Sequence, residues 1–208
     1  MKKLLVLFFG TALLFSTSAH SDVTIGLKAG NGDLEGTNAS YTAGSNTYAS
    51  TTASKDSMFG AIFAELSLGD SPVSIGVEYV PLDADLTLDG KNSSTSANVE
   101  DYTTAYLLYK HDTGSNAVYG KLGYSQADIG TIKSKSTVNS QSSELEGYMV
   151  GAGIETGELA SGFVGRFEVT YTLIDEVHAT TTSNGSSSVK KTADGELVTI
   201  TFGLSKSF

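Results

Sequence analysis

The sequence contains no cysteine, few basic residues and, beyond its N-terminal region, no long apolar run. Without cysteine the chain forms no disulfide, no thiolate metal site and no cysteine nucleophile, and it cannot be a bacterial lipoprotein. Lys and Arg number 13 against 23 Asp and Glu and form no basic stripe, so nucleic acid is not an expected partner. The missing apolar run excludes a membrane helix, which needs about 20 such residues.

The N-terminus has the three-part plan of a secretory signal peptide over residues 1–21. A short basic start is followed by an almost continuous apolar run (4–15) and then by a small, mostly polar stretch. Cleavage fits after Ser21 or after Ala19. We favour Ser21, which leaves 22–208 as a single domain that carries most of the acidic excess.

The remaining chain contains eight segments in which apolar residues alternate with small or polar residues, which is the period of a β-strand. The last segment shows it best, with Val198, Ile200, Phe202, Leu204, Lys206 and Phe208 on one face. The other face is small and polar except for Leu197. The eight predicted strands cover about residues 23–29, 57–68, 73–79, 101–111, 118–125, 147–155, 163–173 and 195–208.

The connections between these strands alternate in length. Four long segments rich in Ser, Thr, Asn and Gly, which we predict to be loops, alternate with three short turns. The long segments are Gly30–Asp56, Leu82–Glu100, Ala127–Ser143 and Asp175–Asp194. An up-and-down meander in a membrane requires this alternation of long and short connections. A soluble secreted domain also fits the composition but does not require the alternation. The sequence therefore predicts an all-β fold, an eight-stranded antiparallel up-and-down transmembrane β-barrel, closed by pairing of the last strand with Val23–Ala29.

Charged side chains fall opposite the apolar set of their strands. The seven that do so are Lys28, Glu65, Glu78, Lys110, Lys121, Arg166 and Glu168. Lys or Arg facing lipid near the midplane would cost about 2–4 kcal/mol, whereas acids and bases inside a closed barrel can compensate one another. We therefore predict that these seven residues line the lumen as a structural charge network.

Aromatic residues fall near the predicted strand ends. They are Tyr79, Tyr109, Tyr124, Tyr148, Tyr171 and Phe208. Such positions are typical of the aromatic girdles that lie at the two membrane surfaces. The high β-propensity of aromatic residues is the simpler explanation of the same positions. We favour the girdles because the residues gather at strand ends.

Four pieces of the chain carry a resemblance to a known family: Val73–Tyr79, Gly147–Glu155, Gly165–Thr172 and the terminal Phe208. In these pieces the chain resembles the small outer-membrane β-barrel family that includes opacity-type surface proteins and the OmpA/OmpX barrels. The resemblance implies a Gram-negative outer membrane and contact with its lipid and lipopolysaccharide. It implies no single activity, since the family spans adhesion, immune evasion, membrane anchoring and unknown roles.

The resemblance also implies that the end of the chain is an assembly signal. Phe202, Leu204 and Phe208 match the residues that the barrel assembly machinery would receive. The family prefers an aromatic residue two positions before the end, and Lys206 stands there instead. We expect the Lys206 ammonium to extend to the headgroups or carbonyls at the periplasmic end of the strand.

Few motifs in the sequence indicate a catalytic or metal-binding site. His111 and His178, the two histidines beyond the signal peptide, are expected at opposite ends of the barrel and so form neither a metal site nor a dyad. His178 with its Ser-rich surroundings fits a lipid A-modifying enzyme only weakly, because Ser is frequent throughout that segment. Asp83–Asp89 lacks the Gly and Glu of a calcium loop, and its alternation favours a strand above the membrane.

We therefore predict a non-enzymatic, monomeric outer-membrane protein with no cofactor. Its role is structural or interactive. We expect four long, polar extracellular loops to contact a host or cell-surface ligand. The alternative is a narrow pore or a conduit for a hydrophobic ligand. A lipid A-modifying enzyme is the third hypothesis.

Overall fold

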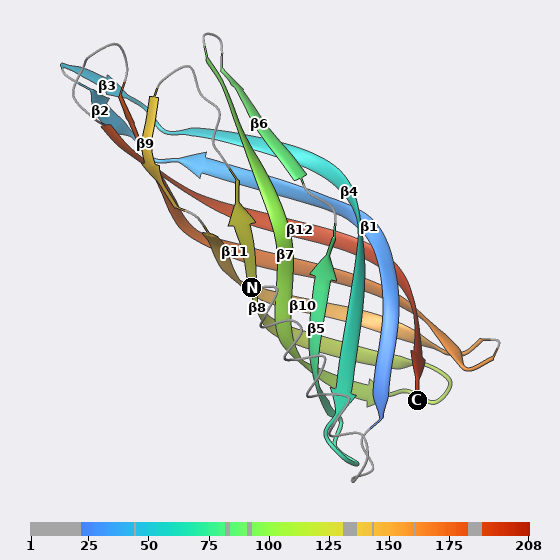
Figure 1. The fold of residues 1–208 in the computed structure, drawn as a ribbon. Coiled ribbons are helices and arrows are strands. Elements are labelled where there is room, and N and C mark those ends of the chain that lie inside the picture. The colour runs from blue at the N-terminus through green and yellow to red at the C-terminus, as the bar shows by residue number, and fades with distance from the viewer. Residues whose placement is uncertain are drawn as a thin grey trace.

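A computed structural model shows one closed antiparallel β-sheet with a small hairpin at one end (Figure 1). It describes residues 22–43, 45–81, 84–90, 93–130, 137–142, 144–159, 161–182 and 189–208. The predicted signal peptide therefore lies outside the described residues. No helix in the described part of the chain is both long enough and apolar enough to cross a membrane.

Eight strands form the wall of the barrel. They are β1 (Val23–Asn38), β4 (Thr51–Ser67), β5 (Val73–Val80), β7 (Ser93–Asp112), β8 (Ala117–Ile129), β10 (Glu144–Glu158), β11 (Phe163–Thr182) and β12 (Val189–Ser207). Each strand pairs with the next in this order, and β12 pairs back with β1. The ring confirms the predicted eight-stranded up-and-down transmembrane β-barrel. The last strand closes it as expected, with Leu27 opposite Leu204 and Ala29 opposite Phe202.

The four segments predicted to be loops are largely β-structure, so their predicted secondary structure was wrong. β1 and β4 remain paired as far as Asn38 and Thr51. Further short strands are β2 (Tyr41–Ala43), β3 (Asn46–Tyr48), β6 (Ala84–Gly90) and β9 (Thr137–Gln141). These segments are rich in Thr, which favours extended backbone, so they can form strands without a sustained alternation. The end that carries them is called the outer end below.

Short turns join the strands at the opposite, inner end. These are the connections between β4 and β5, between β7 and β8, and between β10 and β11. Each contains one glycine in the left-handed region: Gly69 (φ 61°), Gly114 (φ 99°) and Gly162 (φ 79°). Residues with a Cβ rarely adopt this conformation, and this explains how the chain reverses within so few residues. Val23 and Phe208 exchange two backbone hydrogen bonds, of 3.3 and 2.9 Å, at the same end.

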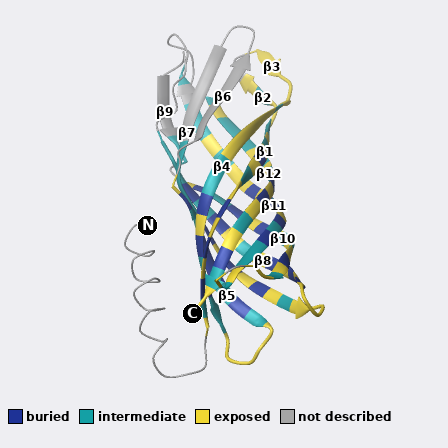
Figure 2. Ribbon diagram, turned by 90° about the vertical axis from the view of Figure 1, so that its right-hand side faces the viewer, coloured by how far each residue is buried: buried dark blue, intermediate teal, exposed yellow. Residues whose placement is uncertain are grey.

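The two faces of the wall differ as the alternation predicts. Figure 2 shows buried and exposed residues alternating along the strands. Outward apolar side chains in the middle of the wall are more than half exposed, among them Leu27, Leu122, Tyr148, Phe202 and Leu204. Inward positions hold buried Thr, Ser and charged residues. An apolar band surrounding a polar interior is the arrangement that a hydrocarbon layer requires.

The interior is narrow enough for aromatic rings to lie directly over glycines. A Cβ on Gly26 would lie 2.2 Å from the Phe63 ring, and one on Gly76 would lie 2.4 Å from the Tyr106 ring. These inward glycines therefore make room for rings that cross the lumen and support the charged residues between them.

Candidate functional site: an ion-paired layer beneath an apolar cavity

Four charged side chains form an inner ion cluster, which we define as Glu65, Lys110, Glu155 and Arg166. Both terminal nitrogens of Arg166 donate to Glu65, at 2.7 Å to Oε1 and 2.6 Å to Oε2. Arg166 Nη2 also pairs with Glu155 Oε1, and Lys110 Nζ lies 2.7 Å from Glu155 Oε2. The Tyr106 hydroxyl donates to Glu65 Oε1 at 2.8 Å. Two-pronged binding of a carboxylate by a guanidinium fixes the relative positions of their strands.

An outer ion cluster lies next to it, formed by Lys28, Glu78, Lys121 and Glu168. Lys28 Nζ lies 2.6 Å from Glu78 Oε2 and 2.5 Å from Glu168 Oε1. Lys121 Nζ lies 3.4 Å from Glu78 Oε2 and 3.1 Å from Glu168 Oε2. Tyr119 donates to Glu168 Oε2 at 3.1 Å. Two acids and two bases thus share one buried site.

The structure brings all seven predicted lumen residues into these two clusters and adds an eighth. Glu155, which is buried, completes a balance of four acids and four bases. Its place in the alternation, on the face of Gly151 and Gly153, could have identified it. Lys110 differs from the rest because a third of its side chain is exposed, close to the inner end.

An apolar cavity of about 270 Å³ lies on the outer side of these clusters. Its lining includes Leu34, Val80, Val99, Leu145, Met149, Ile174 and Leu197, together with Phe59 and Tyr102. Several of these side chains pack against the buried cluster of Ala127, Leu145 and Ile174. By comparison, the space among the charged residues is a cavity of about 10 Å³. Sequence reasoning missed the large cavity, because its lining residues are spread over seven strands and meet only in the closed barrel.

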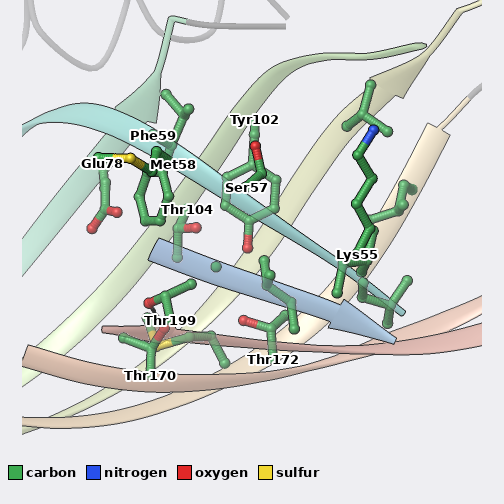
Figure 3. A pocket seen from close by; sticks show the side chains of 18 residues that line it. Lys55, Ser57, Met58, Phe59, Glu78, Tyr102, Thr104, Thr170, Thr172 and Thr199 are labelled. Atoms are coloured by element: carbon green, nitrogen blue, oxygen red, sulfur yellow. Dashed lines mark hydrogen bonds between the residues drawn. The ribbon is translucent and has the colours of Figure 1, made fainter. Parts of the chain in front are cut away.

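Polar groups line the cavity both at its floor and toward its outer end, where Lys55 and Ser57 lie on β4. Figure 3 shows Glu78, Thr104, Thr170 and Thr199 among the side chains that line it. The Thr170 and Thr199 hydroxyls bond each other at 2.7 Å. Glu78 belongs both to this floor and to the outer ion cluster. The cavity is therefore a mainly apolar space with Glu78 at its base and Lys55 toward its outer end, and such a make-up is usual for a small-molecule site.

In the part of the chain that the structure describes, β4 pairs less far with β5 than with β1 beside this cavity. β4 pairs with β1 along Thr51–Leu66 but with β5 only along Ile62–Ser67, and Pro81 follows directly on β5. Proline has no backbone N–H to donate to a ladder. Met58 is 85% exposed on the outer face of β4 and also lines the cavity. Met58 thus links the cavity lining to the outer face of β4.

The remaining candidate residues lie apart from this site. His178 Nδ1 lies 3.0 Å from the Ser142 hydroxyl at the outer end, whereas His111 lies on β7 near the inner end, so the structure separates the two histidines as predicted. Asp83 lies outside the described residues. Within the part of the chain that the structure describes, no group of three or more His, Cys, Asp or Glu side chains could hold a metal ion.

The C-terminal residues lie at the inner end of the barrel, on the outward-facing side of its wall. Phe202 and Phe167 pack with ring centroids 5.0 Å apart, and Phe208 is exposed. Lys206 Nζ lies 5.6 Å from the centroid of the Phe163 ring and 5.7 Å from that of Phe208. Flanking aromatic rings thus surround the Lys206 ammonium at the end of the apolar band.

The geometry is that of a small transmembrane barrel with an occluded centre. No protein-family model and no curated protein matches the sequence. Among solved structures, the outer membrane protein OprG from Pseudomonas aeruginosa is similar, with a TM-score of 0.66 and 14% identity. The similarity covers 90% of this chain and 97% of OprG. It shows that the chain has the fold of the small outer-membrane β-barrel proteins.

Two further solved structures match with lower scores. Neisserial surface protein A is 13% identical with a TM-score of 0.47, over 90% of this chain and 97% of that chain. The outer membrane protease OmpT from Escherichia coli is 9% identical with a TM-score of 0.48, over the same shares. Scores this low carry no argument. The activity of this chain therefore has to be inferred from its own lumen.

Proposed function

We propose that this protein is a monomeric, non-enzymatic barrel of the Gram-negative outer membrane that takes up small apolar molecules at its outer end. The observation that supports this most is the apolar cavity of about 270 Å³ above a layer of ion pairs. A 150 Å³ apolar cavity in another protein holds benzene, so this one has room for about ten non-hydrogen atoms. The proposal develops the hydrophobic-ligand conduit that the sequence suggested as an alternative.

The edge of β4 supplies a route between cavity and membrane. A straight path through the barrel would cross eight charged side chains, where the free space is only about 10 Å³. A path past Met58 and Val80 crosses apolar side chains and leads to the apolar outer band. Transfer of an apolar molecule along the second path avoids desolvating the ion pairs. The ligand would therefore leave sideways into the lipid rather than through the ion-paired layer.

Methionine methyl groups report directly on this cavity. Met58 and Met149 are the methionines left after removal of the signal peptide, and both line it. Naphthalene, which has ten carbons, should shift the ¹³C-methyl NMR signals of both residues in protein reconstituted in lipid nanodiscs. Gly32→Phe places a ring in the cavity and should abolish the shifts. Gly60→Phe, whose side chain points out of the same wall, is the matched control and should retain them.

Two results would end this proposal. One is the absence of any Met149 shift in the unmodified protein. The other is an equal shift in Gly32→Phe, because the probe would then report partition into lipid rather than occupation of the cavity.

A second candidate function is surface contact through the outer strand extensions. Acidic side chains face outward in neighbouring strands there, with Asp33 opposite Asp56 and Glu35 opposite Glu196. Such a polar, acidic rim favours a basic partner surface on a host or neighbouring cell. Replacing these four acidic residues with Asn or Gln should abolish cell binding while the barrel still inserts. Unchanged binding would contradict this role.

A further inference from the structure

The floor of the cavity presents an unusual acceptor. Glu78 is only 8% exposed, and both of its ion pairs, to Lys28 and to Lys121, are made through Oε2. A carboxylate has about four lone-pair sites. Glu78 lines the cavity, so its carboxylate can accept a further hydrogen bond from a donor in the cavity.

A second polar group lies directly across the ladder. Thr104 faces Glu78 in the pairing of β5 with β7, and both line the cavity (Figure 3). The Thr104 and Ser125 hydroxyls lie 2.8 Å apart, so Thr104 can accept from Ser125 and donate into the cavity. The floor thus offers one acceptor and one donor side by side.

We propose that the cavity selects apolar molecules that carry one neutral hydroxyl group, and that Glu78 and Thr104 bind this group. The inference rests on the proposed function of the cavity. A ligand hydroxyl donates a hydrogen bond to the Glu78 carboxylate and accepts one from the Thr104 hydroxyl, and its apolar body fills the space above.

The charge balance of the outer ion cluster disfavours the binding of ionised ligands. Its two acids and two bases already balance, and the Lys28 and Lys121 ammonium groups contact Glu78 and Glu168. A carboxylate ligand would add an uncompensated negative charge beside Glu78, and an amine would add an uncompensated positive one. Burying a charge that has no counter-charge is costly, whereas a hydroxyl adds none.

Three probes of one shape test the inference: naphthalene, 2-naphthol and 2-naphthoate. In the methionine NMR assay, 2-naphthol should bind about tenfold more tightly than either of the others, as expected for one hydrogen bond to a charged acceptor. Glu78→Gln should reduce the preference for 2-naphthol over 2-naphthoate to about threefold or less, since the repelling charge is gone. Thr104→Val, which keeps the shape of the side chain, should weaken 2-naphthol binding and leave naphthalene unchanged.

Glu168→Gln is the matched control. Glu168 shares Lys28 and Lys121 with Glu78 but does not line the large cavity. This variant should therefore keep the preference for 2-naphthol over naphthalene, two neutral probes, whereas Glu78→Gln should reduce it. Equal binding of 2-naphthol and 2-naphthoate, with naphthalene still bound, would overturn the inference and leave the proposed function standing. If no probe shifts Met149, both fail. An equal loss of the preference for 2-naphthol over naphthalene in Glu168→Gln would also overturn the inference, and Thr104→Val decides the matter should Glu78→Gln not fold.

Discussion

At the scale of single residues, Arg166 connects the inner ion cluster. It binds Glu65 with two nitrogens and Glu155 with one of them. The alternation of the sequence was sufficient to place Arg166 and Glu65 in the lumen. It could not pair them, because they are 101 positions apart and only the register of the closed ring brings them together. The sequence thus predicts which face of its strand a side chain occupies, whereas the ion-pair partner of that side chain depends on the closed structure.

Glu155→Gln should lower the free energy of unfolding by about 3–5 kcal/mol, because Arg166 and Lys110 lose a buried counter-charge. Urea unfolding in lipid vesicles, followed by gel mobility, measures the change. Glu158→Gln, three positions along the same strand and exposed, should alter stability by about 0.5 kcal/mol or less. Equal effects of the two substitutions would show that the ion pairs do not contribute to stability.

At the scale of strands, the sequence predicted all eight wall strands but not their outer extensions. β11 runs from Phe163 to Thr182, whereas alternation predicted a strand only as far as residue 173. A register shift between Ile174 and Val177 interrupts the period of two just beyond that point. Leu197 was an exception on the polar face of the last strand, and the structure explains it as a lining residue of the cavity.

The apolar band makes a prediction at this scale. Leu122 is exposed on β8, where it pairs with Leu107 and Val150 of the neighbouring strands. Leu122→Arg should lower the free energy of unfolding in lipid by about 2–4 kcal/mol, because the guanidinium would face hydrocarbon. Glu144→Arg, at the outer end of β10, should cost about 1 kcal/mol or less. A similar cost at both positions would place the lipid boundary elsewhere on the barrel.

At the scale of the whole molecule, the lumen is divided into two parts. The ion clusters fill the middle and the apolar cavity occupies the outer part. Composition and strand alternation predicted the closed barrel and the charged interior. They could not predict the cavity, because its volume depends on how side chains from seven strands meet across the lumen. Its lining residues are ordinary apolar residues with no motif to mark them.

An occluded lumen should not conduct ions. In planar lipid bilayers the unmodified protein is expected to give no steady single-channel current. Arg166→Ala leaves Glu65 and Glu155 without their shared counter-charge and should admit cations and water, so cation-selective openings are expected. Steady conductance of the unmodified protein at the level of this variant would favour the narrow pore instead.

All of these statements depend on the closed ring in which β12 pairs with β1. The mobility of the protein in gels of outer-membrane fractions, unboiled and boiled, tests this ring most directly. The ring predicts that the unboiled protein remains folded and migrates differently from the boiled protein. Identical mobility in both samples, or recovery of the chain in the soluble periplasmic fraction, would contradict the account.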